Sequence, residues 1–131
     1  GLAVLLATRL SDRDDEVVEA ISLLDDCRSV YLEYGMAAES AGCDHEAAAL
    51  LARRASHRAA RARYEAALAS YQAIPADQRD QHWRADVADC NGNVAVLEIL
   101  DREPGTAIPA GAFASGGHTM EHDAQWARGL G

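Results

Sequence analysis

The feature that most constrains the fold is a run of 30 residues, from His45 to Ile74, that contains neither glycine nor proline. Its apolar positions are mainly alanines, and alanine favours helix because it loses no side-chain entropy on entering one. The run predicts one helix of up to about 30 residues, or roughly 45 Å at the standard rise. Asp44 is its candidate N-cap, and Pro75 ends it. A stripe of alanines would let a neighbouring helix pack closely; the stripe consists of positions 48, 52, 55, 59, 62 and 66.

Two helices are predicted before this run. A short apolar helix is expected from Leu2 to Leu10, and Ser11 or Asp12 can cap the next one. Apolar side chains then recur at three- and four-residue steps, which indicates one buried helix face. This second helix is expected to run to about Ser40 with a break near Gly35, and Gly42 is its natural stop. The buried face comprises Val17, Ile21, Leu24, Cys27 or Arg28, and Tyr31.

Two further helices are predicted after Pro75. Asp77 can cap a segment whose buried face is formed by Trp83, Val87 and Cys90, and the Asn91-Gly92-Asn93 triplet would end it. The apolar run 94–100 is then expected to form a short helix with Asn93 as its N-cap. From residue 104 onward glycine, proline and alanine dominate, which is typical of a linker or a loosely held tail.

These patterns predict an all-α fold of four to five helices. Residues 1–103 would form the helical core domain, and residues 104–131 a Gly/Pro/Ala-rich linker and C-terminal tail. An antiparallel helical bundle and a short array of helical hairpins both explain the apolar stripes. The length of 131 residues suffices for one hydrophobic core.

The stretch from Tyr31 to Ala55 resembles one unit of the tetratricopeptide repeat family. Tyr31 stands at the family's first large aromatic position, Tyr34 and Gly35 at its leucine-glycine pair, and Gly42 at its turn. Ala47 and Leu51 match its second helix, whereas Ala38 and Arg54 depart from the pattern and no proline closes the unit. The resemblance implies helical hairpins that bind peptides or partner proteins on a concave face.

The net charge of -9 disfavours binding to nucleic acid or to anionic membranes over the whole surface. The three cysteines cannot all pair within the chain and form no CxxC motif, so we expect reduced thiols. The apolar start, Gly1 to Ala7, is too short to span a bilayer and lacks the pattern of a signal peptide. We therefore expect a cytoplasmic protein.

The sharpest local charge feature is the segment from Arg53 to Arg63, in which Arg54, Arg58 and Arg61 share one helix face. This stripe could contact a partner, grip an anion, or read DNA in a helix-turn-helix arrangement. Alternatively, it pairs with carboxylates of the preceding acidic helix and is structural. These carboxylates are Asp14, Asp15, Glu19, Asp25 and Asp26.

Other residues suggest ligand or metal binding. His118 and His122 lie one helical turn apart with Glu121 between them, the order of an inverted zinc-peptidase signature, which could hold a metal ion. Trp83, Tyr31 and Tyr34 could line a pocket. Asp44-His45-Glu46 is interpreted as a helix start, at which capping is the ordinary role of such residues.

The leading hypothesis is a non-catalytic protein-protein interaction or scaffold module, which binds another protein or peptide or a second copy of itself. Two alternatives remain: a DNA-binding transcriptional regulator that uses Arg53–Arg63, and a small-ligand or metal-binding helical bundle with or without a reaction. No nucleophile or glycine-rich phosphate loop stands in a known motif, so neither catalytic residues nor a cofactor are expected.

Overall fold

The computed structural model describes the backbone of residues 2–114 and the side chains of residues 15–114. Over this range the chain forms four α-helices and one 3-10 turn, which confirms the predicted all-α class. The elements are α1 (Leu2–Glu33), α2 (Ala37–Arg53), α3 (His57–Gln72), η1 (Ala76–Gln78) and α4 (Gln81–Arg102). None of the described helices is long and apolar enough to cross a membrane.

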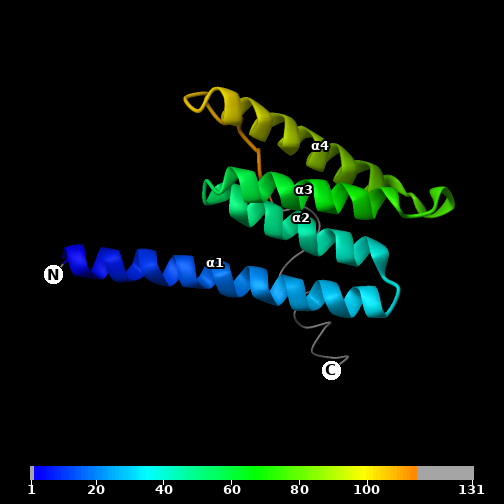
Figure 1. Ribbon diagram of the computed structural model, residues 1–131, viewed down its shortest axis with the longest axis horizontal. Coiled ribbons are helices and arrows are strands. Elements are labelled where there is room, and N and C mark those ends of the chain that lie inside the picture. Colours follow the sequence, from blue (N-terminus) through cyan, green and yellow to red (C-terminus); the bar gives the residue numbers. More distant parts are fainter. Residues whose placement is uncertain (1, 115–131) are drawn as a thin grey trace.

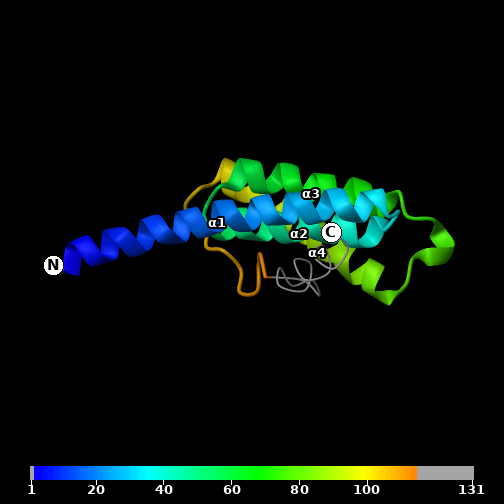
Figure 2. The same cartoon turned by 90° about the horizontal axis from the view of Figure 1, so that it is seen from below.

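The helices are stacked in the order of the sequence (Figure 1). The main helix contacts join α1 to α2, α2 to α3, and α3 to α4. Successive helices run in opposite directions, and the first part of α1 extends past the ends of the others in both views (Figures 1 and 2). The arrangement is therefore a row of antiparallel hairpins.

The core has two parts, one on each side of α2. The smaller part lies between α1 and α2 and consists of Leu24, Cys27, Tyr31, Cys43 and Ala47. The larger part is formed by α2, α3 and α4 and includes buried alanines, Tyr64, Tyr71, Cys90, Leu97, Leu100 and Phe113. Because α2 has neighbours on both sides, every residue from 40 to 49 is buried.

The prediction of one helix across 45–74 is wrong, because the chain turns between α2 and α3. The Ser56 amide donates to the Leu51 carbonyl (2.9 Å) and the Ala55 amide to that of Ala52 (3.0 Å), the pattern of a Schellman motif. Ala55 stands where such motifs usually have glycine, with a φ of 61°. The left-handed conformation costs alanine about 1 kcal/mol, which the packing of α3 on α2 offsets.

The boundaries of the first two helices also differ from the prediction. No glycine or proline lies between Leu2 and Tyr34, and α1 runs unbroken through Ser11. The expected break at Gly35 is confirmed: its φ is +71°, and the Met36 amide donates to the Tyr31 carbonyl at 2.8 Å. Gly42 does not stop a helix, since it lies inside α2 together with Asp44, the expected N-cap.

Helix α4 begins later and ends later than predicted. Asp80, and not Asp77, is its N-cap, and the Asp80 carboxylate accepts a hydrogen bond from the Trp83 amide at 2.9 Å. The helix passes through Asn91-Gly92-Asn93 without a break. It continues because Asn93 is buried and its side chain bonds to neighbouring elements.

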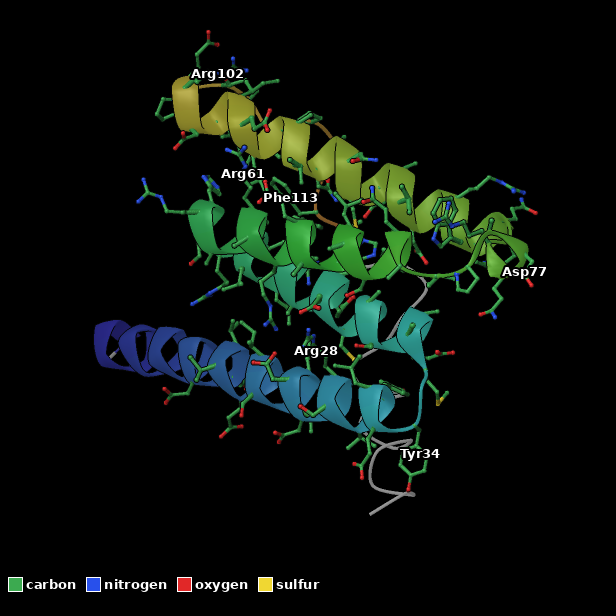
Figure 3. The ribbon with its side chains drawn as sticks, turned by 45° about the vertical axis from the view of Figure 1, so that its right-hand side comes forward. Arg28, Tyr34, Arg61, Asp77, Arg102 and Phe113 are labelled. Atoms are coloured by element: carbon green, nitrogen blue, oxygen red, sulfur yellow. The ribbon has the colours of Figure 1, made fainter. Side chains whose placement is uncertain are left out.

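The segment after α4 returns to the helices as far as the structure describes it. Phe113 is buried between α3 and α4 (Figure 3), where its amide donates to Asn93 Oδ1 at 3.2 Å. Its carbonyl accepts from Arg53 Nη1 at 2.6 Å. Part of the predicted tail therefore belongs to the packed core.

Candidate functional site

A network of buried polar side chains joins α2, α3 and α4. At its centre is His45, which is 1% exposed. His45 Nε2 lies 2.6 Å from Asp89 Oδ2, and His45 Nδ1 lies 3.2 Å from the Tyr71 hydroxyl. Asn93 Nδ2 donates to Asp89 at 3.1 Å and to the Tyr64 hydroxyl at 3.2 Å. We call His45, Tyr64, Tyr71, Asp89 and Asn93 the polar network.

The partner at Nε2 fixes one proton of the His45 ring. A carboxylate only accepts hydrogen bonds, so His45 Nε2 carries a proton and donates to Asp89. The neutral form of the ring with its proton on Nε2 accepts at Nδ1 from the Tyr71 hydroxyl, whereas the charged form donates there. Every ring nitrogen thus has a partner, which a buried histidine requires because an unpaired polar group is costly to bury.

The network has the order hydroxyl, imidazole and carboxylate, as in the triads of hydrolases, but its hydroxyl belongs to the buried Tyr71. Burial, followed by the nearby Asp86, raises the pKa of Tyr71 above its ordinary value, and burial likewise raises that of Tyr64. Burial also raises the pKa of the Cys90 thiol to about 12. These groups stay protonated, and the network is suited to holding α2, α3 and α4 in a fixed arrangement.

The raised pKa values predict a loss of stability in alkali. In the unfolded chain Cys90 and the two tyrosines lose protons near pH 9.0 and 10.0, whereas in the folded chain they retain them. Stability is therefore full below pH 9 and falls as the pH rises toward the folded values, by about 1.4 kcal/mol per pH unit for each group. Urea unfolding should show a loss of about 3 kcal/mol between pH 8.5 and 10.5.

The matched control for this titration is the double variant Tyr64→Phe/Tyr71→Phe, compared with the unmodified chain at each pH. Its alkaline slope above pH 10 should be shallower, because only Cys90 of the three groups still titrates. An unchanged slope would show that the two tyrosines do not contribute to the alkaline loss.

A second buried polar group lies next to His45 in α2. Asp44, only 2% exposed, accepts from Arg28 Nε at 2.8 Å, and Arg63 Nη1 lies 3.6 Å away. Arg63 also pairs with Asp25 of α1. Arg28 occupies the space between α1 and α2 (Figure 3). One carboxylate thus joins arginines from α1 and α3 across the central helix.

A groove crosses the end of the molecule where α3 leads through η1 into α4. It has a volume of about 390 Å³ and adjoins the polar network through Tyr71. We call it the end groove. Its lining consists of Ala38, Glu39, Tyr71, Ile74, Gln78, Asp80, His82, Trp83, Ala85 and Asp86.

Of the three aromatic residues predicted to share a pocket, Trp83 alone lines the end groove. Tyr31 is buried between α1 and α2. Tyr34 is exposed at the end of α1, where its side chain points away from the helices (Figure 3). The structure does not bring these residues together.

The three arginines predicted to share one helix face have different surroundings. Arg61, between α3 and α4 in Figure 3, donates to Glu98 at 2.8 Å and to Glu65 at 3.2 Å. Arg54 and Arg58 are exposed at and beyond the turn before α3. Arg63, which lies in the same segment, pairs with Asp25 of the acidic first helix.

The remaining predicted features concern metal ions and thiols. His118 and His122 lie outside the described residues. Within the described part of the chain no cluster of three metal-binding side chains occurs. All three cysteines lie in that part, buried and without a disulfide.

Sequence reasoning missed the central role of Asp44, His45 and Asp89. The signal was present, because Asp44-His45-Glu46 is flanked on both sides by small residues. Three ionisable residues among alanines, glycine and cysteine indicate a helix enclosed on all sides, with partners supplied by its neighbours.

A second hollow, of about 500 Å³, lies between α1 and the turn that joins α2 to α3. Its lining includes Val17, Val18, Ile21 and Leu51, with Arg53 and Arg54 at the turn. Val18 is 67% exposed, which makes this an apolar surface on an outer helix.

Comparison with protein-family models, with curated proteins and with solved structures found no match to this chain.

Proposed function

We propose that the chain is a non-catalytic interaction module, a short scaffold of helical hairpins that binds a segment of another protein. The observation that carries the proposal is the end groove, an open and mixed polar and aromatic surface built from α2, α3, η1 and α4. It adjoins the polar network, whose tyrosine hydroxyls have raised pKa values, as does the thiol of the buried Cys90. A rigid surface without an activated group is suited to recognition.

The packing order of the helices supports the same reading. Each helix contacts mainly its neighbours in the sequence, as in helical-hairpin arrays such as the tetratricopeptide repeats, which expose long surfaces to partners. The turn of the first hairpin is at Gly35 and not at Gly42, so the proposed likeness concerns the stacking of hairpins and not the repeat's register.

The two alternative functions have less support. A DNA-binding surface needs arginines directed at phosphates, yet Arg61 carries two carboxylate partners and Arg63 pairs with Asp25 and Asp44. A small-ligand enzyme needs a reactive group that its substrate can reach, and the Tyr71 hydroxyl and the Cys90 thiol belong to buried residues.

Site-specific photo-crosslinking in the native source organism tests the proposal. A crosslinking residue at Ala38, in the end groove, should attach to one discrete partner, whereas the same residue at Ala62, exposed on α3, should not. The purified partner should then bind the purified chain in calorimetry.

A second candidate function is self-association along α1, which the exposed apolar surface around Val18 favours. A crosslinking residue at Val18 tests it.

Each result has a definite meaning. A crosslinked species of twice the chain mass from Val18 alone would replace the partner-binding proposal with self-association. No adduct at Ala38 or Val18, together with a retained small molecule in native mass spectrometry, would contradict the interaction function and favour a ligand-binding bundle.

A further inference from the structure

The lining of the end groove is acidic. Glu39 comes from the start of α2, Asp80 caps α4, and Asp86 lies in the second turn of α4. The Trp83 amide, which donates to Asp80, holds the pKa of this carboxyl below its usual value. Among the lining residues His82 supplies the one imidazole, and no arginine is present. Carboxylates from two helices around one space favour a cation between them.

The wall between these carboxylates is aromatic and rigid. Trp83 Nε1 donates to the Tyr71 carbonyl at 2.7 Å, and the guanidinium of Arg79 lies 4.6 Å from the centre of the Trp83 ring. Arg79 is itself anchored, since it donates to the carbonyls of Ile74 (2.9 Å) and Gln72 (2.8 Å). A fixed aromatic wall beside carboxylates fits a side chain with an alkyl stem and a cationic head.

The groove continues beyond the space that one side chain would fill. An adjoining hollow of about 340 Å³ shares Ala38, Glu39, Ile74 and Gln78 with it and extends to the turn at Gly35. Together the two hollows form a path from the start of α2 to the start of α4. An extended peptide can follow such a path, and its backbone would place one side chain against Trp83.

We propose that the end groove binds an extended, basic segment of a partner protein and seats one arginine or lysine side chain against Trp83, between Glu39 and Asp86. This inference rests on the proposed interaction function and adds the chemistry of the partner. The net charge of -9 also favours a basic partner, because an acidic protein attracts positive charge at long range.

The test uses short synthetic peptides of glycine and serine with two arginines, and matched peptides in which glutamine or glutamate replaces both arginines. Binding to the full chain is measured by calorimetry at low salt and by the NMR signal of the Trp83 indole N–H. The arginine peptide should bind at least about tenfold more tightly than the glutamine peptide, and the glutamate peptide should not bind. Added salt should weaken the binding.

Two double variants locate the site. Glu39→Gln/Asp86→Asn should weaken binding of the arginine peptide about tenfold. Glu19→Gln/Asp26→Asn, which removes the same charge from exposed positions of α1, should leave the affinity within about twofold. Thermal unfolding of each variant verifies that it is folded. If Glu39→Gln/Asp86→Asn does not fold, the shift of the Trp83 signal in the unmodified chain decides whether the peptide binds in the end groove.

Three outcomes would overturn the inference: equal loss of affinity in both double variants, no shift of the Trp83 signal, or binding of free arginine amide as tight as that of the peptide. The last would identify a small-ligand site. A crosslinked partner at Ala38 that lacks affinity for basic peptides would reject the partner's proposed chemistry and leave the interaction function standing. Failure of both experiments would reject both proposals.

Discussion

Replacing His45 with alanine is expected to lower the free energy of unfolding by about 4 kcal/mol. The variant leaves a space in the core, removes a hydrogen-bond partner of the Tyr71 hydroxyl, and leaves Asp89 with Asn93 alone of its two partners in the network. Because small domains are stable by only about 5 to 15 kcal/mol, this single change would bring the chain close to unfolding at physiological temperature. Urea unfolding at pH 7, monitored by circular dichroism, measures the loss.

Asp89→Asn is the matched control for that variant. The asparagine oxygen can still accept from His45 Nε2, and Asp89 is 38% exposed, so water can compensate part of the change. The expected loss is about 1 kcal/mol. Nitrogen NMR of the unmodified chain should show the proton of His45 on Nε2. A loss below about 1 kcal/mol for His45→Ala would contradict the assignment of His45 to a buried network.

Asp44→Asn is expected to cost about 3 kcal/mol, the second largest effect. The substitution keeps the shape of the side chain but leaves the guanidinium groups of Arg28 and Arg63 facing a neutral amide in a buried site. Removal of one partner from a buried ion pair is strongly destabilising. Both arginines are partly exposed, which places the effect at the lower end of the known range.

The control for Asp44 is Glu98→Gln, which breaks a surface ion pair with Arg61. Both side chains of that pair are substantially exposed, so the expected loss is below about 1 kcal/mol. Thermal and urea unfolding of the two variants should therefore differ clearly. Equal effects would indicate that Asp44 is accessible to water and does not join α1 to α3.

Much of the helical content could be predicted from the sequence, because it depends on local properties. The spacing of Leu24, Cys27 and Tyr31 correctly predicted the buried face of α1, and Pro75 correctly predicted that α3 ends before it. The break expected near Gly35 is present, although it ends α1 and the expected end near Ser40 was wrong. In these places one residue type determines the outcome largely without help from distant parts of the chain.

The candidate site was only partly predictable. Trp83 was identified, but it was grouped with Tyr31 and Tyr34, which lie elsewhere. The end groove is assembled from the beginnings of α2 and α4 and the end of α3, so its lining is adjacent in space and scattered in sequence. Helical periodicity assigns a residue to a face of its own helix and does not indicate which neighbour meets that face.

The sequence by itself determined that this chain is helical, acidic and rich in alanine, with a helix end at Pro75 and a break at Gly35. Only the tertiary structure decided that Ala55 turns the chain and that Asp44 and His45 are buried. The physical reason is that the left-handed backbone at Ala55 and the burial of ionisable side chains are each unfavourable when only the local sequence is considered. A left-handed alanine and an enclosed charge persist only when other helices supply compensating contacts, and those contacts come from residues far away in the sequence.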